Sequence, residues 1–291
     1  MDGMNRWMIG ARPRTLPAAV VPVALGAAAA AGGAHPVWWR VAPALVVSLA
    51  LQVGVNFAND YSDGVRGTDE VRVGPVRLVA SGLATPAAVK KAALAAFGVA
   101  AIAGLALASV TTWWLLVVGV AAILAAWGYT GGPRPYGYMG LGEVFVFVFF
   151  GLVATLGSMY VVGEQITLVG WLAGCAAGCL ACALLVVNNL RDIPTDREVG
   201  KHTLAVRIGD RPTRWFYVAL LSVAQVLVIA IALVDRPWAA IGLLGILVAR
   251  PAVKAVLGGA KGPALIPVLG LTGKVQLATG LLAALAMAVS R

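Results

Sequence analysis

Nine apolar stretches of bilayer length run through the 291 residues of this chain. A stretch of about 20 mainly apolar residues can cross the hydrocarbon core as a helix, which hydrogen-bonds its backbone polar groups internally. Hydrophobic residues make up 60% of the chain, charged residues only 12%, and the mean hydropathy is +0.90, which excludes an ordinary soluble domain. We therefore expect an all-α polytopic membrane bundle of about nine transmembrane helices, folded as one domain over residues 1–291. The expected segments are residues 16–33, 41–58, 92–110, 112–128, 141–162, 168–190, 215–234, 238–257 and 271–289.

The basic residues predict how this bundle is oriented. With nine crossings the termini lie on opposite sides, and a cytoplasmic amino-terminus places 19 of the 22 Lys and Arg residues on the cytoplasmic side. Only Arg40, Arg236 and Arg291 then fall outside. Because cytoplasmic loops carry the excess of Lys and Arg, we expect the amino-terminus and the long polar loops in the cytoplasm. The carboxyl-terminus is expected outside, in a multi-pass protein of the inner (cytoplasmic) membrane.

Acidic residues are concentrated where the second apolar segment ends. Asn56, Asp60 and Asp63 are spaced by four and three residues, so a helix that persists to Asp63 projects them from one face. Charge at the end of an apolar segment is costly and usually functional. An ordinary solvated helix end would also carry polar residues here, but it does not explain why the pattern occurs twice.

The second copy lies where the sixth apolar segment ends. Asn188, Asp192 and Asp196 are spaced by four and four residues, so Asn-x-x-x-Asp recurs at matching membrane depth. Four predicted crossings separate the copies, and an even number preserves orientation. We expect a parallel pseudo-repeat of the helix groups around residues 41–91 and 168–214, enclosing one cytoplasm-facing active-site cavity.

The residue types of the two motifs indicate a magnesium site. Asp and Asn supply hard oxygen ligands, and Mg²⁺ is typically held by a few carboxylates, with water and substrate phosphates in the remaining positions. The implied ligand is a phosphorylated lipid. The candidate metal ligands are Asn56, Asp60, Asp63, Asn188, Asp192 and Asp196.

A long basic loop follows each motif. Arg66, Arg72 and Arg77 follow the first, and Lys201 and Arg207 follow the second. The net charge of +10 is thus concentrated at one membrane face, where it suits anionic lipid head groups and a diphosphate. Topology alone explains most of these residues, and nucleic acid is not needed as a partner.

At residues 12–17, 59–61, 74–79, 140–146 and 188–192 the sequence resembles the UbiA superfamily of intramembrane aromatic prenyltransferases, and within it the branch that acts on dihydroxynaphthoate. The resemblance covers nearly the whole chain and rests on several specific motifs. It implies Mg²⁺-dependent transfer of a polyprenyl group from polyprenyl diphosphate to the aromatic acid 1,4-dihydroxy-2-naphthoate. Loss of the carboxylate then gives demethylmenaquinone, in menaquinone biosynthesis. The first motif departs from the superfamily pattern, because five residues rather than three separate Asp63 from Asp69, which leaves open whether Asp69 binds metal.

The resemblance also implies roles for individual residues. The catalytic carboxylates that hold Mg²⁺ against the diphosphate would be Asp60, Asp63, Asp192 and Asp196. The substrate-binding candidates are Arg12, Arg14, Asn59, Arg66, Arg72, Arg77, Tyr129, Lys201 and Arg207. The basic side chains after the two motifs would neutralise the departing pyrophosphate. The ring of Tyr129, which interfacial anchoring also explains, would face the allylic cation.

Three other interpretations compete. A CDP-alcohol phosphotransferase shares Asp60-x-x-Asp63-Gly64, but the pattern breaks because Gly67 and Thr68 stand where Ala-Arg is needed. A cation-coupled transporter explains paired carboxylates in a repeat, but would place them near mid-membrane rather than at one face. A UbiA enzyme that prenylates another aromatic acceptor stays open, since the sequence identifies no acceptor-binding residue.

Overall fold

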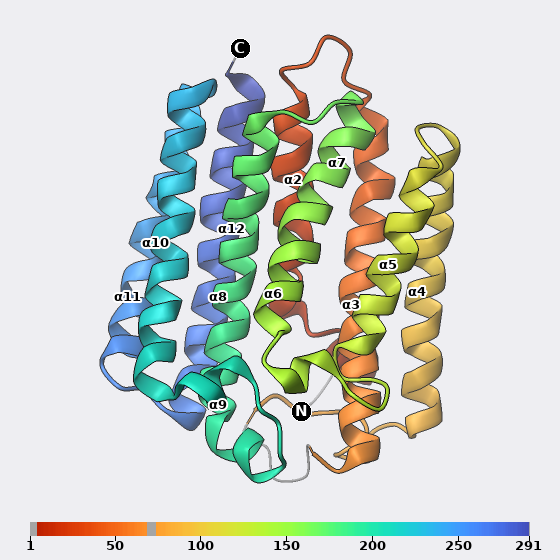
Figure 1. Ribbon diagram of the computed structural model, residues 1–291, viewed down its shortest axis with the longest axis vertical. Helices are drawn as coiled ribbons and strands as arrows, with labels where there is room; N and C mark the ends of the chain where they lie inside the picture. Colours follow the sequence, from red (N-terminus) through yellow and green to blue (C-terminus); the bar gives the residue numbers. More distant parts are fainter. Residues whose placement is uncertain (1–4, 69–73, 291) are drawn as a thin grey trace.

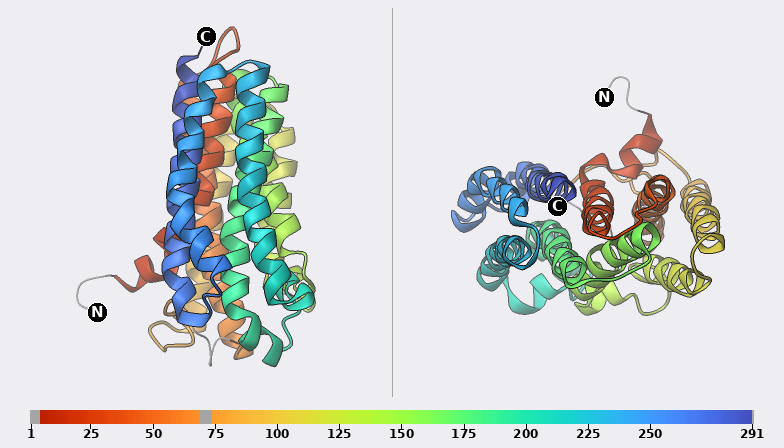
Figure 2. Two further views of the ribbon diagram at one scale, coloured as in Figure 1. Left: turned by 90° about the vertical axis from the view of Figure 1, so that its left-hand side faces the viewer. Right: turned by 90° about the horizontal axis from the view of Figure 1, so that it is seen from above.

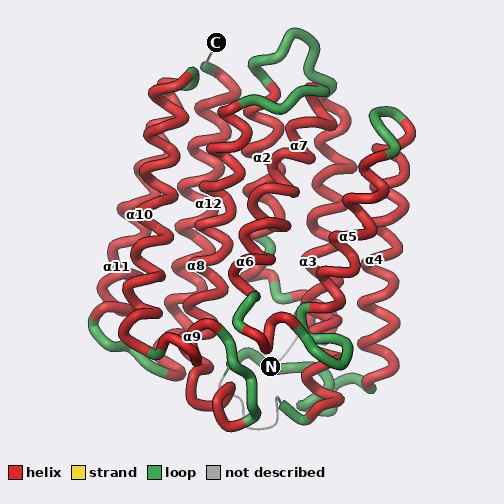
Figure 3. Tube along the Cα trace, in the orientation of Figure 1, coloured by secondary structure: helices red, strands yellow, loops and turns green. Residues whose placement is uncertain are grey.

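The computed structural model describes residues 5–68 and 74–290, which are helical and form no β-strand within these ranges. Long helices run side by side, and short helical turns and loops cover the two ends (Figure 1, Figure 3). The long helices are α2 (Pro17–Ala30), α3 (Val41–Arg66), α4 (Pro86–Ser109), α5 (Trp114–Gly128), α7 (Ala154–Gly163), α8 (Leu168–Glu198), α10 (Asp210–Val234), α11 (Gly245–Leu257) and α12 (Ile266–Val289). The shorter elements are α1 (Arg6–Ala11), η1 (Pro13–Thr15), η2 (Trp38–Arg40), η3 (Tyr136–Met139), α6 (Gly142–Val146), η4 (Phe147–Val153), α9 (Leu204–Ile208), η5 (Pro237–Leu244) and η6 (Gly262–Leu265). The predicted all-α class is confirmed.

Seven helical runs in the described ranges are long and apolar enough to cross a membrane. They are Trp38–Arg66, Pro86–Ser109, Gly142–Gly163, Leu168–Glu198, Asp210–Val234, Pro237–Leu257 and Gly262–Val289. An eighth is the pair Arg6–Thr15 and Pro17–Ala30, bent by 51°, if the pair forms one span. α5 occupies the remaining predicted segment but has only 15 residues, short of the usual spanning length. The helix positions are thus as predicted, and the number of crossings stays a prediction.

α8 is the central helix of the bundle. It packs against α2, α7, α10, α12 and η4, and most of its side chains from Val169 to Asp192 are buried. Viewed along the helix axes, α10–α12 form one side, α3–α5 the other, and α2, α7 and α8 lie between (Figure 2). The contact of α8 with η4 requires glycine, because a Cβ on Gly151 would lie 2.5 Å from the Cα of Gly178. Small residues let membrane helices approach this closely.

The two motif-bearing helices, α3 and α8, end at the same end of the bundle. α1 lies there too, and the carboxyl-terminus lies at the opposite end (Figure 1). Gly67 ends α3 in the left-handed conformation, with φ of 73°, and its N–H donates back to the carbonyl of Gly64 at 3.3 Å. This turn directs the chain away from α3 directly after the first motif, so that the following loop can fold beneath the bundle.

Candidate active site

A cavity of about 1080 Å³ lies among α3, α4, α5, η4, α7 and α8 and is lined by residues of both motifs. Polar residues line it near the ends of α3 and α8, and apolar residues such as Ala44, Leu107 and Val161 line its other part. At 1.5 Å per residue, α3 rises by roughly 28 Å between Ala44 and Asp63. The cavity therefore follows α3 over most of the height of the bundle.

α3 presents a row of polar side chains to this cavity. Gln52, Asn56, Asn59 and Asp63 follow one another at spacings of four, three and four residues, and all four line it. Asp60 does not. The expectation that Asn56, Asp60 and Asp63 share the cavity face is therefore wrong for Asp60. With 3.6 residues per turn the face is centred on Asn59 and Asp63, which turns Asp60 toward the loop that follows α3.

Asp60 is fully buried and anchors that loop. Its Oδ2 accepts a hydrogen bond from the backbone N–H of Leu78 at 2.8 Å, and its Oδ1 accepts one from Val79 at 3.0 Å. Leu78 is fully buried in a core cluster with Phe57. The Asp60 carboxylate thus holds the segment that carries Arg77 against α3. Its role as a metal ligand stays a prediction.

Asp63 is the carboxylate of the first motif that faces the cavity. The hydroxyl of Tyr138 donates to its Oδ1 at 2.7 Å, and Lys201 Nζ donates to its Oδ2 at 3.1 Å. A guanidinium nitrogen of Arg77 lies 4.0 Å from the same oxygen. Three groups that are remote in sequence therefore converge on one carboxylate at the end of α3.

The second motif faces the cavity with all three of its residues, because Asn188, Asp192 and Asp196 all line it from α8. Arg191, which is 2% exposed, donates to both carboxylate oxygens of Asp192 at 2.7 Å and to Asn188 Oδ1 at 3.0 Å. Such bidentate pairing fixes the plane of a carboxylate as well as its position. Asp192 is therefore held in one orientation at the cavity wall.

The Asn-x-x-x-Asp pair of α3 that shares the cavity with the second motif lies about one helical turn closer to the carboxyl end of α3 than expected. Asn59 and Asp63 are also an Asn-x-x-x-Asp pair, and this pair lines the same cavity as Asn188 and Asp192. Thr130 donates to the Asn59 amide oxygen at 2.8 Å. The pair on α3 that corresponds to Asn188 and Asp192 is thus Asn59 and Asp63, rather than Asn56 and Asp60.

Four of the basic residues predicted to bind substrate line the cavity: Arg12, Arg14, Arg77 and Lys201. Arg77 and Lys201 are each 9% exposed, so their charges lie in a largely water-free setting next to Asp63. Electrostatic interactions are stronger there than at an open surface. A further candidate, Arg72, lies outside the described residues, as does Asp69.

Arg66 and Arg207 do not line the cavity, and their role in binding the diphosphate stays a prediction. Arg66 donates to the backbone carbonyls of Thr130 and Gly132, which ties the loop after α5 to the end of α3. Arg207 donates to the carbonyl of His202 at 3.0 Å. Backbone carbonyls of neighbouring loops hold both guanidinium groups, and the sequence alone does not distinguish them from Arg77.

Aromatic rings line one wall of the cavity. Tyr129 lies on the cavity as predicted, and its ring meets that of Tyr136 edge-on at 5.5 Å. Tyr136 stacks on Phe145 at 3.8 Å, and Phe145 on Phe149 at 6.1 Å. Burial, followed by the charge of Glu143, raises the pKa of the Tyr129 hydroxyl well above its usual value. The Tyr129 side chain is therefore neutral, and its ring can stabilise a cation through the negative face of its π-system.

The donor set fits Mg²⁺ when a diphosphate supplies the remaining ligands. Within residues 5–68 and 74–290, no three His, Cys, Asp or Glu side chains form a ready-made metal cluster. The carboxylates of Asp63, Asp192 and Asp196 nevertheless line the same cavity as Arg77 and Lys201. Mg²⁺ is usually held by only one or two carboxylates together with substrate phosphates, so a complete protein cage is not required.

Sequence reasoning missed three residues of this site. Tyr138 binds Asp63, Arg191 binds Asp192, and Gln52 extends the polar row of α3. Gln52 could have been found, because it lies four residues before Asn56 inside an otherwise apolar segment. Tyr138 carries no such signal, since only the folded loop brings it to α3.

Comparison with known proteins identifies the fold family. Residues 19–257 match the model of the UbiA prenyltransferase family. The chain belongs to this family. A relative from Mycobacterium tuberculosis named 1,4-dihydroxy-2-naphthoate octaprenyltransferase is 51% identical over 99% of this chain and 98% of its own length. The Escherichia coli protein of the same name is 39% identical over 74% of this chain and 72% of its own.

Solved structures of UbiA homologues share the fold. A homologue from Archaeoglobus fulgidus, bound to GPP and Mg²⁺, superposes with a TM-score of 0.67 at 15% identity, covering 98% of this chain and 97% of that one. The homologue from Aeropyrum pernix gives 0.66 at 17% identity, over 91% of this chain and 95% of that one. The chain is thus an integral membrane protein with the UbiA fold.

Proposed function

We propose that this UbiA enzyme transfers a polyprenyl group from polyprenyl diphosphate to 1,4-dihydroxy-2-naphthoate, with loss of the carboxylate as CO₂, giving the hydroquinone form of demethylmenaquinone. The cavity supports this most directly, because carboxylates and cations at one end adjoin a long apolar part. Such a cavity matches a substrate with a charged head and a long apolar chain. The relative that shares 51% of its residues supports the choice of acceptor.

The polar end of the cavity would hold the diphosphate. Asp63, Asp192 and Asp196 would hold Mg²⁺, together with the amide oxygens of Asn59 and Asn188. Mg²⁺, when bound, supplies positive charge that stabilises the leaving diphosphate. Lys201 and Arg77, and Arg72 from the loop after α3, would donate to the diphosphate oxygens, whose negative charge grows as the C–O bond breaks. Asn56 and Asp60 would support this site through α1 and the loop of Arg77, respectively.

The other residues would control the carbon chemistry. Breaking the C–O bond releases pyrophosphate and leaves an allylic cation, which the neutral ring of Tyr129 would face. The ring carbon that carries the carboxylate then forms the new C–C bond, and loss of CO₂ restores the aromatic ring. The apolar wall would keep water from the cation. Arg66 would contribute indirectly, by holding the loop of Tyr129 and Tyr138 against α3.

The same reasoning supports an orientation. The cavity end and the amino-terminus would face the cytoplasm, and the carboxyl-terminus would lie outside the inner membrane. The positions of α1 and the ends of α3 and α8 at one end of the bundle support this (Figure 1). They also support the single domain with a parallel repeat around residues 41–91 and 168–214.

Purified protein in detergent, with Mg²⁺, a polyprenyl diphosphate and a panel of aromatic acids, tests the activity. We expect the hydroquinone form of demethylmenaquinone, which O₂ in air can oxidise to the quinone, and one CO₂ per turnover from dihydroxynaphthoate. Preference for another acid would assign the chain to a different UbiA reaction. Absence of turnover with every acid would overturn the proposed reaction with aromatic acids.

A further inference from the structure

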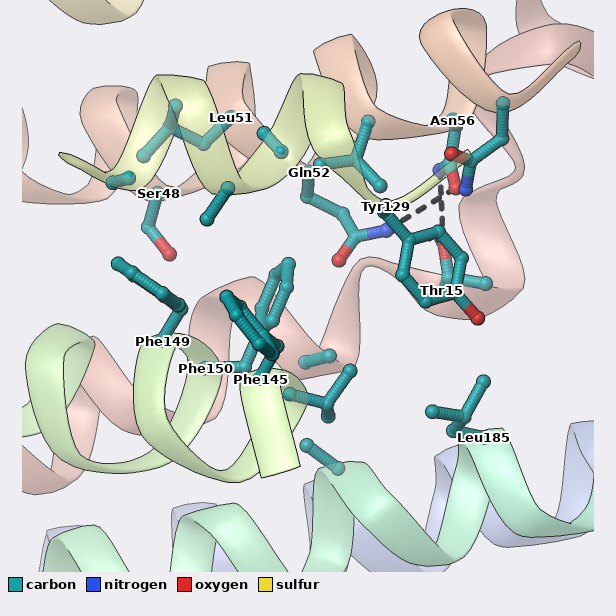
Figure 4. Close-up of a pocket in the computed structure, with 18 of the residues that line it drawn as sticks. Thr15, Ser48, Leu51, Gln52, Asn56, Tyr129, Phe145, Phe149, Phe150 and Leu185 are labelled. Atoms are coloured by element: carbon teal, nitrogen blue, oxygen red, sulfur yellow. Dashed lines mark hydrogen bonds between the residues drawn. The ribbon is translucent and has the colours of Figure 1, made fainter. Parts of the chain in front are cut away.

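Between the diphosphate end and the apolar part, the cavity has two different walls, and we call this part of it the slot. One wall is α3 with η1, which contributes Ser48, Gln52, Asn56 and Thr15. The facing wall is α6 with η4, which contributes Phe145, Phe149 and Phe150 (Figure 4). Amide groups therefore face phenylalanine rings across the slot.

The hydrogen bonds of the α3 wall fix the orientation of each amide. Asn56 Nδ2 donates to the backbone carbonyl of Ala11 at 2.8 Å, so the Asn56 amide oxygen must face the other way, toward Gln52. Gln52 Nε2 donates to that oxygen at 3.3 Å. A backbone carbonyl accepts but does not donate, which removes the usual ambiguity about which atom of an amide is nitrogen.

Thr15 completes the network. Its hydroxyl donates to the carbonyl of Arg12 at 3.0 Å and accepts from Asn56 Nδ2 at 3.0 Å and from Gln52 Nε2 at 3.1 Å. Both N–H groups of each amide are then used. The amide oxygen of Gln52 has no partner within the described part of the chain, although the residue is only 6% exposed. Figure 4 shows this oxygen on the side of the phenylalanine rings.

An amide oxygen that borders the cavity without a protein partner selects a ligand that donates a hydrogen bond. A ligand that displaces water from this oxygen without donating to it leaves the oxygen unsatisfied at a cost, whereas a hydroxyl group satisfies it. A polyprenyl chain has no donor, whereas a hydroxylated aromatic ring does. Resting on the proposed function, we infer that this slot binds the aromatic acceptor, with a ring hydroxyl donating to Gln52 Oε1 and the ring packed against Phe145 and Phe149.

The π-helix η4 shapes the aromatic wall. Phe147–Val153 forms a π-helical turn inside the run from α6 to α7, and π-turns often mark functional sites. Gly151 on this turn packs against α8 at Gly178, while Phe149 and Phe150 line the cavity. The rings of Phe145 and Phe149 are nearly parallel, at an interplanar angle of 19° and a centroid distance of 6.1 Å, so they form an ordered aromatic stack against which an aromatic ligand can pack.

The positive charges of Arg12 and Arg14 at the edge of the slot suit a ligand that carries a carboxylate. Arg12 and Arg14 lie on the same turn as Thr15 and line the cavity. One guanidinium nitrogen of Arg12 donates to the carbonyl of Asn56 at 3.2 Å, which places this side chain beside the amide network. A carboxylate on the ring would therefore find a cation close to the group that binds the hydroxyl. The slot thus matches a hydroxylated aromatic acid.

Steady-state kinetics of Gln52→Leu, varying each substrate in turn, test the inference. We expect the KM for dihydroxynaphthoate to rise about tenfold, the effect of one hydrogen bond, while the KM for polyprenyl diphosphate stays within about twofold. The Ki of 2-naphthoate, which lacks both ring hydroxyls, should change by less than about twofold, because it makes no hydrogen bond to Gln52 in either protein. Gln276→Leu, at a buried glutamine of α12 outside the cavity, is the matched control and should alter none of these constants.

Phe149→Leu provides a second variant on the opposite wall. It should raise the KM for the acid about threefold to tenfold and keep the preference for the hydroxylated ring. If Gln52→Leu does not fold, Gln52→Met and Phe149→Leu decide the question. An equal rise of both KM values, or an unchanged KM for the acid in a folded Gln52 variant, overturns the slot assignment. Failure of the wild-type protein to use dihydroxynaphthoate would instead overturn the proposed function.

Discussion

Lys201 Nζ lies 3.1 Å from Asp63 Oδ2, although 138 residues separate the two in sequence. The pair joins the loop after α8 to the end of α3, and thus connects the two motif regions directly. Asp63 is 2% exposed and Lys201 9% exposed, so neither charge is strongly screened by solvent. Because removing one partner of a buried pair leaves the other unpaired, both residues are sensitive positions.

Lys201→Gln should therefore reduce turnover by about a hundredfold, as loss of one group that stabilises the leaving anion typically does. The KM for polyprenyl diphosphate should rise, and the KM for the aromatic acid should change little. The matched control is Lys91→Gln, at an exposed position on α4. Normal kinetics of Lys201→Gln would mean that the charge of Lys201 serves only to fix the orientation of the protein in the membrane.

Arg191 should be required for the position of Asp192 rather than for its charge. Arg191→Lys keeps the charge but not the planar fork that contacts both carboxylate oxygens, so we expect an activity loss of about 10- to 100-fold. Titration of the variant with Mg²⁺ should show a raised requirement for the ion. An unchanged Mg²⁺ dependence would mean that Asp192 does not need this orientation.

Tyr138 should remain protonated over the working pH range. Burial, and then the negative charge of Asp63, raises the pKa of its hydroxyl above the usual value of about 10. The hydrogen bond to Asp63 is therefore present at neutral pH, and the stability it contributes is lost only as the pH rises above about 10. Tyr138→Phe should lower the free energy of unfolding by about 1–3 kcal/mol at neutral pH.

The pH dependence provides the check on that variant. Thermal unfolding in detergent should show that the wild-type protein loses stability between neutral pH and the region above pH 10. Tyr138→Phe should lose less over the same interval, because it has one fewer group to ionise. Parallel decline of the two proteins would contradict a raised pKa of Tyr138.

The helix positions could be predicted because they depend on the length of apolar stretches, which a bilayer requires of any spanning helix. The second motif could also be predicted, because all three of its residues lie on the cavity face of α8. Which residues of the first motif face the cavity could not be predicted. Asp60 and Asp63 both lie near the expected face, and only the packing of the following loop decides that Asp60 binds the N–H groups of Leu78 and Val79.

The same limit applies to the basic loops. The sequence does not distinguish Arg66 from Arg77 and Lys201, because all three follow an acidic motif. In the structure, the carbonyls of Thr130 and Gly132 hold Arg66, whereas Arg77 and Lys201 line the cavity. Loop conformation, not residue type, makes this difference. The acceptor slot was likewise not predictable, because it needs a π-helical turn that no pattern of apolar residues indicates.

Gly151 should be essential for folding, because its missing side chain allows η4 to contact α8. In Gly151→Leu the new Cβ would lie 2.5 Å from the Cα of Gly178, a backbone atom that cannot move aside. We expect little folded protein by size-exclusion chromatography in detergent. Gly98→Leu on α4, where a Cβ meets nothing within 4 Å, should fold normally. Normal yield of Gly151→Leu would show that η4 can move away from α8.

Asp60 and Asp63 should differ in what their removal affects. Asp60→Ala leaves the N–H groups of Leu78 and Val79 without a carboxylate in a buried setting, at about 1–3 kcal/mol for each donor, so it should unfold at lower temperature. Asp63→Ala removes the carboxylate that lines the cavity. Because this carboxylate also binds Tyr138 and Lys201, Asp63→Ala should unfold at a lower temperature too, and it should lose at least about a hundredfold in turnover.

Mg²⁺ titration then separates a positioning role of Asp60 from direct metal binding. If Asp60 only positions the loop of Arg77, Asp60→Ala should raise the KM for polyprenyl diphosphate while the Mg²⁺ requirement of its remaining activity stays near that of the wild type. If Asp60 is a ligand, as the spacing of the motif predicts, the Mg²⁺ requirement should rise as it does in Asp63→Ala. A stable Asp60→Ala protein with a raised Mg²⁺ requirement would restore Asp60 to the metal site and show that its carboxylate turns toward the cavity when substrate binds.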